Sequence, residues 1–353
     1  MAMSGGVDSS VAAALLARDG HEVVGCFMRL GNVGDQLDQE VSIGHKGCCS
    51  INDANDARQI SAKLGMSFYA LDFKDDFGRI IDYFVDEYNA GRTPNPCVRC
   101  NDWLKFGKLH DYAKSIGAEF VASGHHAQIK PGMSGAELHM GADSGKDQSY
   151  VLFGTHRDRI REMMLPIGHL QKSEVRDLAK EFDLPVFNKP DSQEICFVPD
   201  DNYANLIAKK TPGSMQQGDV LDAEGNVIGK HQGQQKFTIG QRRGLGIALQ
   251  EPAYVIAKDP TLNTVTIGGE ELLSTNTVYA KDTNWLIDIS EDWTECSAKI
   301  RYNTPPALGK VRAVGETIEV LFDTPQRGGA PGQAVVCYEG TKVICGGWID
   351  SVS

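Results

Sequence analysis

The sequence lacks the features that would place it at a membrane. No apolar run approaches the roughly 18 residues that a bilayer-spanning helix needs, so we expect no membrane partner. The N-terminus has no basic region followed by an apolar stretch, so we expect no secretory signal and a cytoplasmic location. The composition, with 41% hydrophobic and 23% charged residues, is that of an ordinary globular protein.

Positive charge is also scarce. The chain has 35 Lys and Arg against 47 Asp and Glu, which gives a formal net charge of −12. Because contacts to nucleic-acid phosphates need Lys and Arg, this balance argues against unspecific nucleic-acid binding. Any RNA partner must therefore be held by a local basic patch.

Two common nucleotide-binding patterns are missing as well. No Gly-x-Gly-x-x-Gly follows an early strand, so a nicotinamide cofactor is not expected. The stretch from Gly141 to Lys146 superficially resembles a Walker A loop. However, only three residues separate its glycines, and Asp147 stands where Ser or Thr belongs. A phosphate site must therefore use another loop.

The order of apolar and polar residues predicts more than one domain in the 353-residue chain. In the first half, strands alternate with helices, which predicts an α/β fold with a doubly wound, mostly parallel sheet. The clearest helix has apolar residues at helical spacing: Phe77, Ile80, Ile81, Phe84, Val85 and Tyr88. Beyond about residue 201, short alternating runs predict a small mixed domain and then a β-barrel or sandwich. We therefore expect domains at 1–206, 207–271 and 272–353.

A pair of glycines precedes the first predicted helix, in Ser4-Gly5-Gly6-Val7-Asp8-Ser9-Ser10. Glycines let the backbone approach an anion closely, and the helix N-terminus favours phosphate or pyrophosphate. The alternative is a Ser or Asp N-cap after a glycine turn, but the full string favours the phosphate site. Such a loop should follow a buried strand of about five residues. Only residues 1–3 precede it, so we expect a short central strand that weakens the sheet and nucleotide binding.

The cysteines form the second group of candidate residues. Nine thiols in a chain without a signal indicate reduced cysteines with metal or catalytic roles. Cys97 and Cys100 fall near the start of a predicted helix, where the helix N-terminus and Arg99 would lower a thiol pKa. Three interpretations are open: a structural zinc site, a redox Cys-x-x-Cys pair, or a pairing with the distant Cys196. A zinc site would want a second Cys or His pair, and none is visible.

Motifs spread over nearly the whole chain resemble those of the tRNA-specific 2-thiouridylases, in the ATP-pyrophosphatase (PP-loop) superfamily. They are residues 4–9, Gly-Arg-Thr-Pro-Asn-Pro before Cys97, Lys105-Phe106-Gly107, Ser123-Gly124-His125-His126-Ala127, Lys146-Asp147-Gln148-Ser149-Tyr150, Ser192 to Phe197, Gly240 to Gly246, Ala298 to Tyr302 and Pro331-Gly332-Gln333. The resemblance implies an adenine nucleotide alpha hydrolase-like domain, followed by a small mixed domain and a C-terminal β-barrel. It also implies a sulfurtransferase that uses ATP, with Mg²⁺, to adenylate a wobble uridine of tRNA and replace its O2 by sulfur.

The resemblance further implies roles for individual residues. Cys196 would carry a persulfide and Cys100 would act as nucleophile and resolving partner, forming a Cys100–Cys196 disulfide. The positions that match ATP contacts are Ala2, Met3, Ser4, Gly5, Gly6, Val7, Asp8, Ser9, Met28 and Gly124. Those that match tRNA contacts are Asn95, Pro96, Cys97, His125, Lys146, Asp147, Gln148, Arg301, Tyr302 and Gln333. The implied sulfur donor is a cysteine desulfurase or a sulfur-relay protein, and we expect a monomer that acts on tRNAs for Lys, Glu and Gln.

Three alternatives stay open at this stage. Many members of the family have Asp where this chain has Cys97, so three thiols could instead hold an iron–sulfur cluster whose open iron binds hydrosulfide. The chain could also be another PP-loop enzyme that adenylates a small carbonyl substrate. Finally, it could bind tRNA without any turnover.

Overall fold

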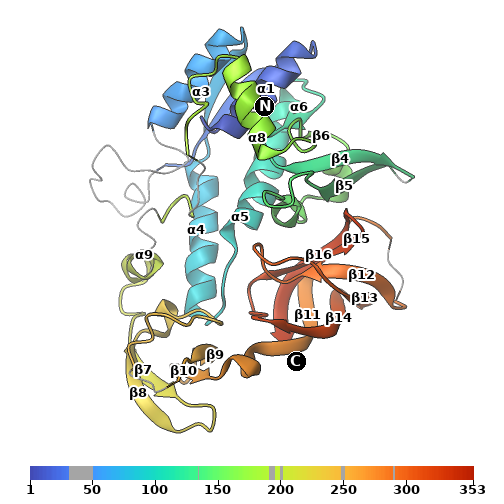
Figure 1. The fold of residues 1–353 in the computed structure, drawn as a ribbon. Helices are drawn as coiled ribbons and strands as arrows, with labels where there is room; N and C mark the ends of the chain where they lie inside the picture. The colour runs from blue at the N-terminus through green and yellow to red at the C-terminus, as the bar shows by residue number, and fades with distance from the viewer. Residues whose placement is uncertain (32–50, 134, 191–194, 199–201, 248–250, 289–290) are drawn as a thin grey trace. The chain divides into compact units, whose positions relative to one another are not determined.

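The computed structural model describes residues 1–353 except 32–50, 134, 191–194, 199–201, 248–250 and 289–290 (Figure 1). These residues form two compact units. The first unit comprises residues 1–80, 97–201 and 341–343, and the second comprises 81–96, 202–340 and 344–353. The expected boundaries near residues 206 and 271 stay a prediction. Of the motif from Ser192 to Phe197, residues 192–194 lie outside the described residues.

A parallel sheet forms the centre of the first unit. Strand β1 (Val24–Arg29) pairs in parallel with β2 (Ser67–Asp72), and β3 (Val121–Ala122) pairs in parallel with β6 (Met163–Met164). Residues 1–3 join the two pairs, because Met3 N donates to Cys26 O and Ala2 N donates to Ala122 O, both at 2.8 Å. The strand order is thus β2, β1, residues 1–3, β3 and β6. The predicted parallel sheet is confirmed, with a central strand of a few residues.

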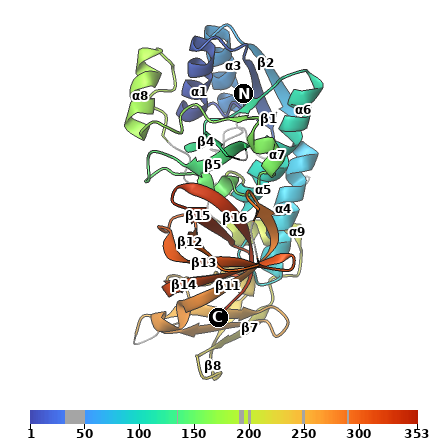
Figure 2. The ribbon, with the colours of Figure 1, turned by 90° about the vertical axis from the view of Figure 1, so that its right-hand side faces the viewer.

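Helices α1 (Val7–Arg18), α3 (Ile51–Lys63) and α8 (Lys172–Glu181) bury apolar side chains in one core with this sheet. Figures 1 and 2 show the three helices at the same end of the unit as β1 and β2. Val11, Ala12 and Ala13 of α1 are fully buried, because the helix carries small and apolar residues where it meets its neighbours. This packing fixes the start of α1, and with it the loop that precedes the helix.

The remaining elements of the first unit begin with the two that carry Cys97 and Cys100. They are α5 (Pro96–Arg99), η1 (Cys100–Lys108), α6 (Leu109–Ser115), the antiparallel hairpin β4 (Ala127–Gly132) and β5 (Gly135–Met140), η2 (Ser149–Leu152) and α7 (Arg157–Ile160). Element η1 is a π-helix, in which hydrogen bonds join residues five apart. The π-helix is rare and is frequently found at functional sites, and here it begins at the predicted thiol Cys100.

Helix α4 (Lys74–Asn89) has the predicted amphipathic pattern, and its six apolar residues named above are all buried. In the second unit, α9 (Tyr203–Lys210) precedes a small sheet. Its strands are β7 (Gln217–Leu221), β8 (Val227–Gln232), β9 (Tyr254–Asp259) and β10 (Thr264–Gly268), in the order β8-β7-β10-β9. The short 3₁₀ helix η3 (Gln234–Lys236) follows β8.

A closed barrel ends the chain (Figure 2). It follows η4 (Glu270–Leu273) and consists of β11 (Ser274–Trp285), β12 (Thr294–Lys299), β13 (Ala307–Val314), β14 (Thr317–Arg327), β15 (Ala334–Glu339) and β16 (Lys342–Val352). The strand order is β11-β14-β13-β12-β15-β16, and β11 also pairs with β16, which closes the barrel. The predicted C-terminal β-barrel is therefore confirmed. Among the helices that the structure describes, none has the length and apolarity needed to cross a membrane.

Candidate functional site

The glycine loop leads from the central strand into α1. Gly5 has a φ of +70°, and a Cβ at this position would lie 2.3 Å from the backbone oxygen of Asp53, so only glycine fits. Ser9 Oγ accepts from Ser4 N at 3.2 Å, and Ser10 Oγ donates to Gly6 O at 2.6 Å. These bonds brace the loop. Gly6 is the N-cap and offers no side chain to the first amide groups of α1, which suits an anion such as phosphate.

Gly124 brings the end of β3 against this loop. A Cβ on Gly124 would lie 2.5 Å from Ser9 N and 2.6 Å from the carbonyl carbon of Asp8. Such a distance is too short for any side chain, so Gly124 permits a close approach of two backbones. Gly124 and Met28, at the end of β1, therefore lie where the open end of a parallel sheet binds ligands.

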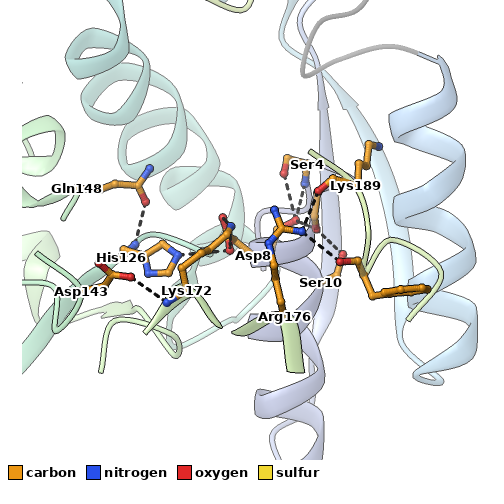
Figure 3. A network of polar contacts seen from close by, with 12 residues as sticks. Ser4, Asp8, Ser10, His126, Asp143, Gln148, Lys172, Arg176 and Lys189 are labelled. Carbon is orange, nitrogen blue, oxygen red and sulfur yellow. Dashed lines mark hydrogen bonds and ion pairs between the residues drawn. The ribbon is translucent and has the colours of Figure 1, made fainter. Parts of the chain in front are cut away.

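Asp8 is the centre of a network of polar contacts (Figure 3). Lys172 Nζ donates to the two carboxylate oxygens of Asp8 at 2.6 and 2.8 Å, and His126 Nε2 lies 3.4 Å from the nearer one. Burial alone would raise the pKa of Asp8, but the bonds from His126 and Lys172 outweigh it, so its pKa lies below the usual range. Asp8 is therefore an ionised carboxylate beside the phosphate loop.

Two further contacts hold the partners of Asp8 in place. Asp143 Oδ2 accepts from the backbone N of Lys172 at 2.9 Å, and Gln148 Oε1 accepts from the backbone N of His126 at 2.8 Å. Gln148 and Asp147 match tRNA contacts of the family, yet both bind the protein's own backbone here. Asp147 is buried and its Oδ1 accepts from Gly141 N and Ser149 N, both at 3.0 Å.

A second lysine braces the loop from the opposite side. Lys189 Nζ donates to Gly5 O at 2.9 Å and to the carboxylates of Asp53 and Asp56 at 2.6 and 2.7 Å. Burial would lower the pKa of Lys189, but these carboxylates raise it above its usual value. Arg176 donates to Lys189 O at 3.3 Å, which fixes the segment that carries the lysine.

Sequence reasoning did not identify His126, Lys172 or Lys189 as members of the site. A partial signal exists for Lys172, since Gln171 and Glu174 form a capping box that marks the start of α8. The pairing with Asp8 has no such signal, because 164 residues separate the two positions along the chain.

Two of the three predicted thiols lie on consecutive helical elements, Cys97 on α5 and Cys100 at the start of η1. Cys97 is exposed, whereas Cys100 and the distant Cys196 are partly buried. On the same two elements, the Arg99 guanidinium lies 5.1 Å from the ring of Trp103, and the Arg79 guanidinium of α4 stacks on that ring at 4.0 Å. All three cysteines are described, and among the described residues no three Cys, His, Asp or Glu side chains form a group able to hold a metal ion.

His125, which is predicted to contact tRNA, is buried in the structure. Its Nδ1 lies 2.7 Å from Ser123 Oγ, and its Nε2 lies 3.5 Å from Lys105 Nζ. Burial, and then the charge of Lys105, holds the pKa of His125 well below its usual value. The imidazole is therefore neutral and accepts a hydrogen bond from Lys105. Of the other predicted contacts in this unit, Lys146 is partly exposed.

In the second unit, the turn at residues 331–333 holds the segment that precedes Cys97. Gln333 Nε2 donates to Thr93 O at 3.0 Å and to Pro94 O at 3.2 Å, and Thr93 N donates to Pro331 O at 2.8 Å. A Cβ on Gly332 would lie 2.9 Å from Thr93 N, so the two segments are in direct backbone contact. The predicted tRNA contact Gln333 thus has both amide hydrogens on the protein.

The guanidinium of Arg301 also binds the protein's own backbone. Its Nε donates to Gly328 O at 2.7 Å and its Nη2 donates to Ile239 O at 2.8 Å, which joins the end of β14 to the segment between η3 and β9 within the second unit. Tyr302 beside it is exposed, and Lys299 Nζ lies 5.9 Å from the ring. Of the predicted contacts in this unit, Asn95 is partly exposed and Pro96 is buried.

A glycine loop between a parallel strand and a helix, ahead of a small sheet and a barrel, defines a nucleotide-binding α/β protein with two β-rich domains. Three family models match it: "tRNA methyl transferase HUP domain" at residues 1–200, "tRNA methyl transferase PRC-barrel domain" at 205–269 and "Aminomethyltransferase beta-barrel domain" at 275–349.

Curated relatives match along nearly the whole chain. The "tRNA-specific 2-thiouridylase MnmA" of Rhodopirellula baltica is 44% identical over 379 residues, which cover 99% of this chain and 95% of that protein. The protein of the same name from Clostridioides difficile is 43% identical, with 99% and 96% covered. This chain belongs to the tRNA-specific 2-thiouridylase family. Among solved structures, an NMN synthetase from Francisella tularensis covers 59% of this chain and 74% of its own, at 19% identity and a TM-score of 0.32, too low to support an argument.

Proposed function

We propose that this protein is an ATP-dependent tRNA sulfurtransferase that replaces O2 of a wobble uridine by sulfur and releases AMP and pyrophosphate. One observation carries the proposal. A glycine loop leads into α1 and leaves its first amide groups without a side-chain cap, in a chain that is 44% identical to a named 2-thiouridylase over 99% of its length. Methyl transfer, which the family descriptions mention, would need neither a pyrophosphate loop nor a distant pair of thiols.

The loop supports the activation step. Uracil O2 is a poor leaving group until it is adenylated, and adenylation requires ATP to lose pyrophosphate. The amide groups at the start of α1 suit the pyrophosphate portion, since the N-cap Gly6 places no side chain over them. Mg²⁺, when bound, would neutralise charge on the phosphates, and Asp8 supplies an ionised carboxylate in the first turn of α1.

The thiols supply the sulfur step. The terminal sulfur of a Cys196 persulfide would attack C2, and AMP would leave with the former O2. The Cys100 thiolate would then attack the inner sulfur of Cys196, which breaks the S–S bond, leaves the sulfur on C2 and forms a Cys100–Cys196 disulfide. An external thiol must reduce this disulfide before the next turnover. A cysteine desulfurase or relay protein would load the persulfide.

We propose that some of the residues that match tRNA contacts bind RNA directly, whereas others hold the protein surface in shape. Tyr302, Asn95 and Lys146 have exposed or partly exposed side chains and suit direct contact with RNA. Arg301, Asp147, Gln148 and Gln333 bind the protein's own backbone and are proposed to shape the surface instead. A monomer with domains at 1–206, 207–271 and 272–353, acting in the cytoplasm, remains part of the proposal.

The test is thiolation of a tRNA transcript in vitro. Purified protein, ATP and a cysteine desulfurase with cysteine should yield AMP, pyrophosphate and 2-thiouridine in equal amounts, and Cys196→Ser should abolish 2-thiouridine. Product formation without ATP, or full activity of Cys196→Ser, would contradict the proposal.

Cys97→Asp distinguishes the persulfide route from an iron–sulfur cluster. The substitution introduces the residue that many family members have, so the persulfide route should retain activity. A cluster held by three thiols would lose both its iron and its activity.

A further inference from the structure

Lys172 is a cation beside the phosphate loop to which no role has yet been assigned. It is the first residue of α8, and its ammonium binds both carboxylate oxygens of Asp8, in the first turn of α1, at 2.6 and 2.8 Å. The Lys172 side chain is 11% exposed, whereas that of Asp8 is 32% exposed. The ion pair thus has its cation largely covered and its anion partly open to solvent. Figure 3 shows the lysine side chain directed at Asp8.

The position of this pair raises an electrostatic question. Pyrophosphate carries several negative charges, and an ionised Asp8 next to the loop would repel it. Removing a cation from water is also costly, so a covered lysine needs a partner in every state of the protein. Asp8 is that partner in the structure, and an incoming phosphate would be a stronger one.

We propose that Lys172 is the phosphate-binding lysine of this site. Its ammonium moves from Asp8 to the pyrophosphate portion of ATP, and stabilises the negative charge that develops as pyrophosphate departs. This inference rests on the proposed function. Asp8 keeps its contact with His126, 3.4 Å away, when the lysine turns.

The anchoring of Lys172 supports such a movement. Its backbone N is fixed by Asp143 at 2.9 Å, and the capping box of Gln171 and Glu174 fixes the start of the helix. Only the flexible side chain has to reorient, because a lysine carries a point charge on a four-carbon stem.

Lys189 does not fit this role equally well. Its three contacts, to Gly5 O, Asp53 and Asp56, match the three protons of an ammonium group. Moving it would release the loop from α3, so Lys189 is suited to bracing the loop.

The test is binding of inorganic pyrophosphate, in EDTA and without tRNA, measured by titration calorimetry. Lys172→Gln should weaken binding about ten-fold or more, because a hydrogen bond to a charged group is lost. Lys172→Arg should recover most of the affinity. Lys180→Gln is the matched control, since Lys180 lies on the same helix, 60% exposed, and pairs with Asp177; it should change the affinity by less than about two-fold.

A double variant separates phosphate binding from simple neutralisation of Asp8. If Lys172 contacts pyrophosphate, then Asp8→Asn with Lys172→Gln should bind about ten-fold more weakly than Asp8→Asn alone. If the lysine only neutralises Asp8, the double variant should match Asp8→Asn, and the inference is wrong. The double variant removes both charges of the pair, and the amide introduced by Asp8→Asn can still accept a hydrogen bond from Lys172 in the single variant, so the comparison gives an answer even if Lys172→Gln alone does not fold.

The outcomes also separate this inference from the proposed function. If wild-type protein thiolates tRNA and binds pyrophosphate while Lys172→Gln binds it equally well, only the inference fails. If wild-type protein binds neither pyrophosphate nor ATP, the activation step of the proposed function fails, and the role of Lys172 fails with it.

Discussion

Replacement of Gln333 by Met tests whether this residue binds tRNA or holds the segment before Cys97. The change removes the two hydrogen bonds from Nε2 to Thr93 O and Pro94 O, at 3.0 and 3.2 Å, and keeps a side chain of similar length. Thr93 and Pro94 are both buried, so the two carbonyl groups would lose their amide partner away from water. Each neutral hydrogen bond contributes about 0.5–1.5 kcal/mol, so the segment should be destabilised by about 2 kcal/mol.

Hydrogen exchange with mass spectrometry measures this effect locally. A loss of about 2 kcal/mol corresponds to roughly 30-fold faster exchange in a peptide covering residues 86–97. The affinity for tRNA should change by less than about two-fold, because the side chain faces the protein. Single-turnover thiolation should slow, since the chain runs directly from this segment into α5, which carries Cys97, and then into η1, which begins at Cys100.

Gln326→Met on strand β14 is the matched control. The side-chain amide of Gln326 donates to O and Oγ1 of Thr324, at 2.8 and 3.3 Å, two residues away on the surface. We expect no change in exchange at residues 86–97 for this variant. A large loss of tRNA affinity in Gln333→Met, with unchanged exchange of that peptide, would refute the holding role and favour direct contact with tRNA.

Three other predictions follow from single contacts. Gly124→Ala should weaken pyrophosphate binding about ten-fold in calorimetry, because its Cβ would meet Ser9 N at 2.5 Å and cost about 1–3 kcal/mol. Gly145→Ala is the control and should not weaken binding, since the atom nearest to its Cβ would be 3.4 Å away. Equal affinities of Gly124→Ala and the wild-type protein would disprove the steric argument. Burial lowers the pKa of Lys258 to about 7 in the folded protein, so between about pH 7 and 10 this lysine is protonated only in the unfolded chain. The free energy of unfolding should therefore rise with pH in this range. Lys258→Met should remove that rise in urea denaturation, and a wild-type and a variant that depend on pH in the same way would contradict the prediction. Arg301→Lys should lower the melting temperature by about 2–4 °C with unchanged tRNA affinity, since lysine keeps the charge but cannot bind Gly328 O and Ile239 O together as the guanidinium does. An unchanged melting temperature with weaker tRNA binding would indicate that Arg301 contacts tRNA directly.

The local parts of the fold could be predicted from sequence because short-range patterns determine them. The spacing of the apolar residues from Phe77 to Tyr88 predicted α4, and its buried face matches. The glycines of the phosphate loop were equally predictable, since Gly5 needs a positive φ that other residues rarely adopt.

Contacts between distant parts of the chain could not be predicted in this way. Lys172 meets Asp8 across 164 residues, and Gln333 meets Thr93 across 240, with no periodicity to signal either pair. The π-helix was also missed, because its backbone pattern depends on neighbours. Arg159, for example, donates to Phe106 O at 2.6 Å, and propensity alone predicts an ordinary α-helix there.

The long separation between Gln333 and Thr93 has a consequence for protein synthesis. Domains usually fold from the N-terminus as the chain emerges, and contacts between distant residues form late. The sheet and phosphate loop can therefore form while the barrel is still being translated. The segment before Cys97 acquires its final hydrogen bonds only when the turn at residues 331–333 exists. We expect a nascent chain to bind nucleotide before its thiol segment is fully ordered, so that sulfur chemistry waits for the complete polypeptide.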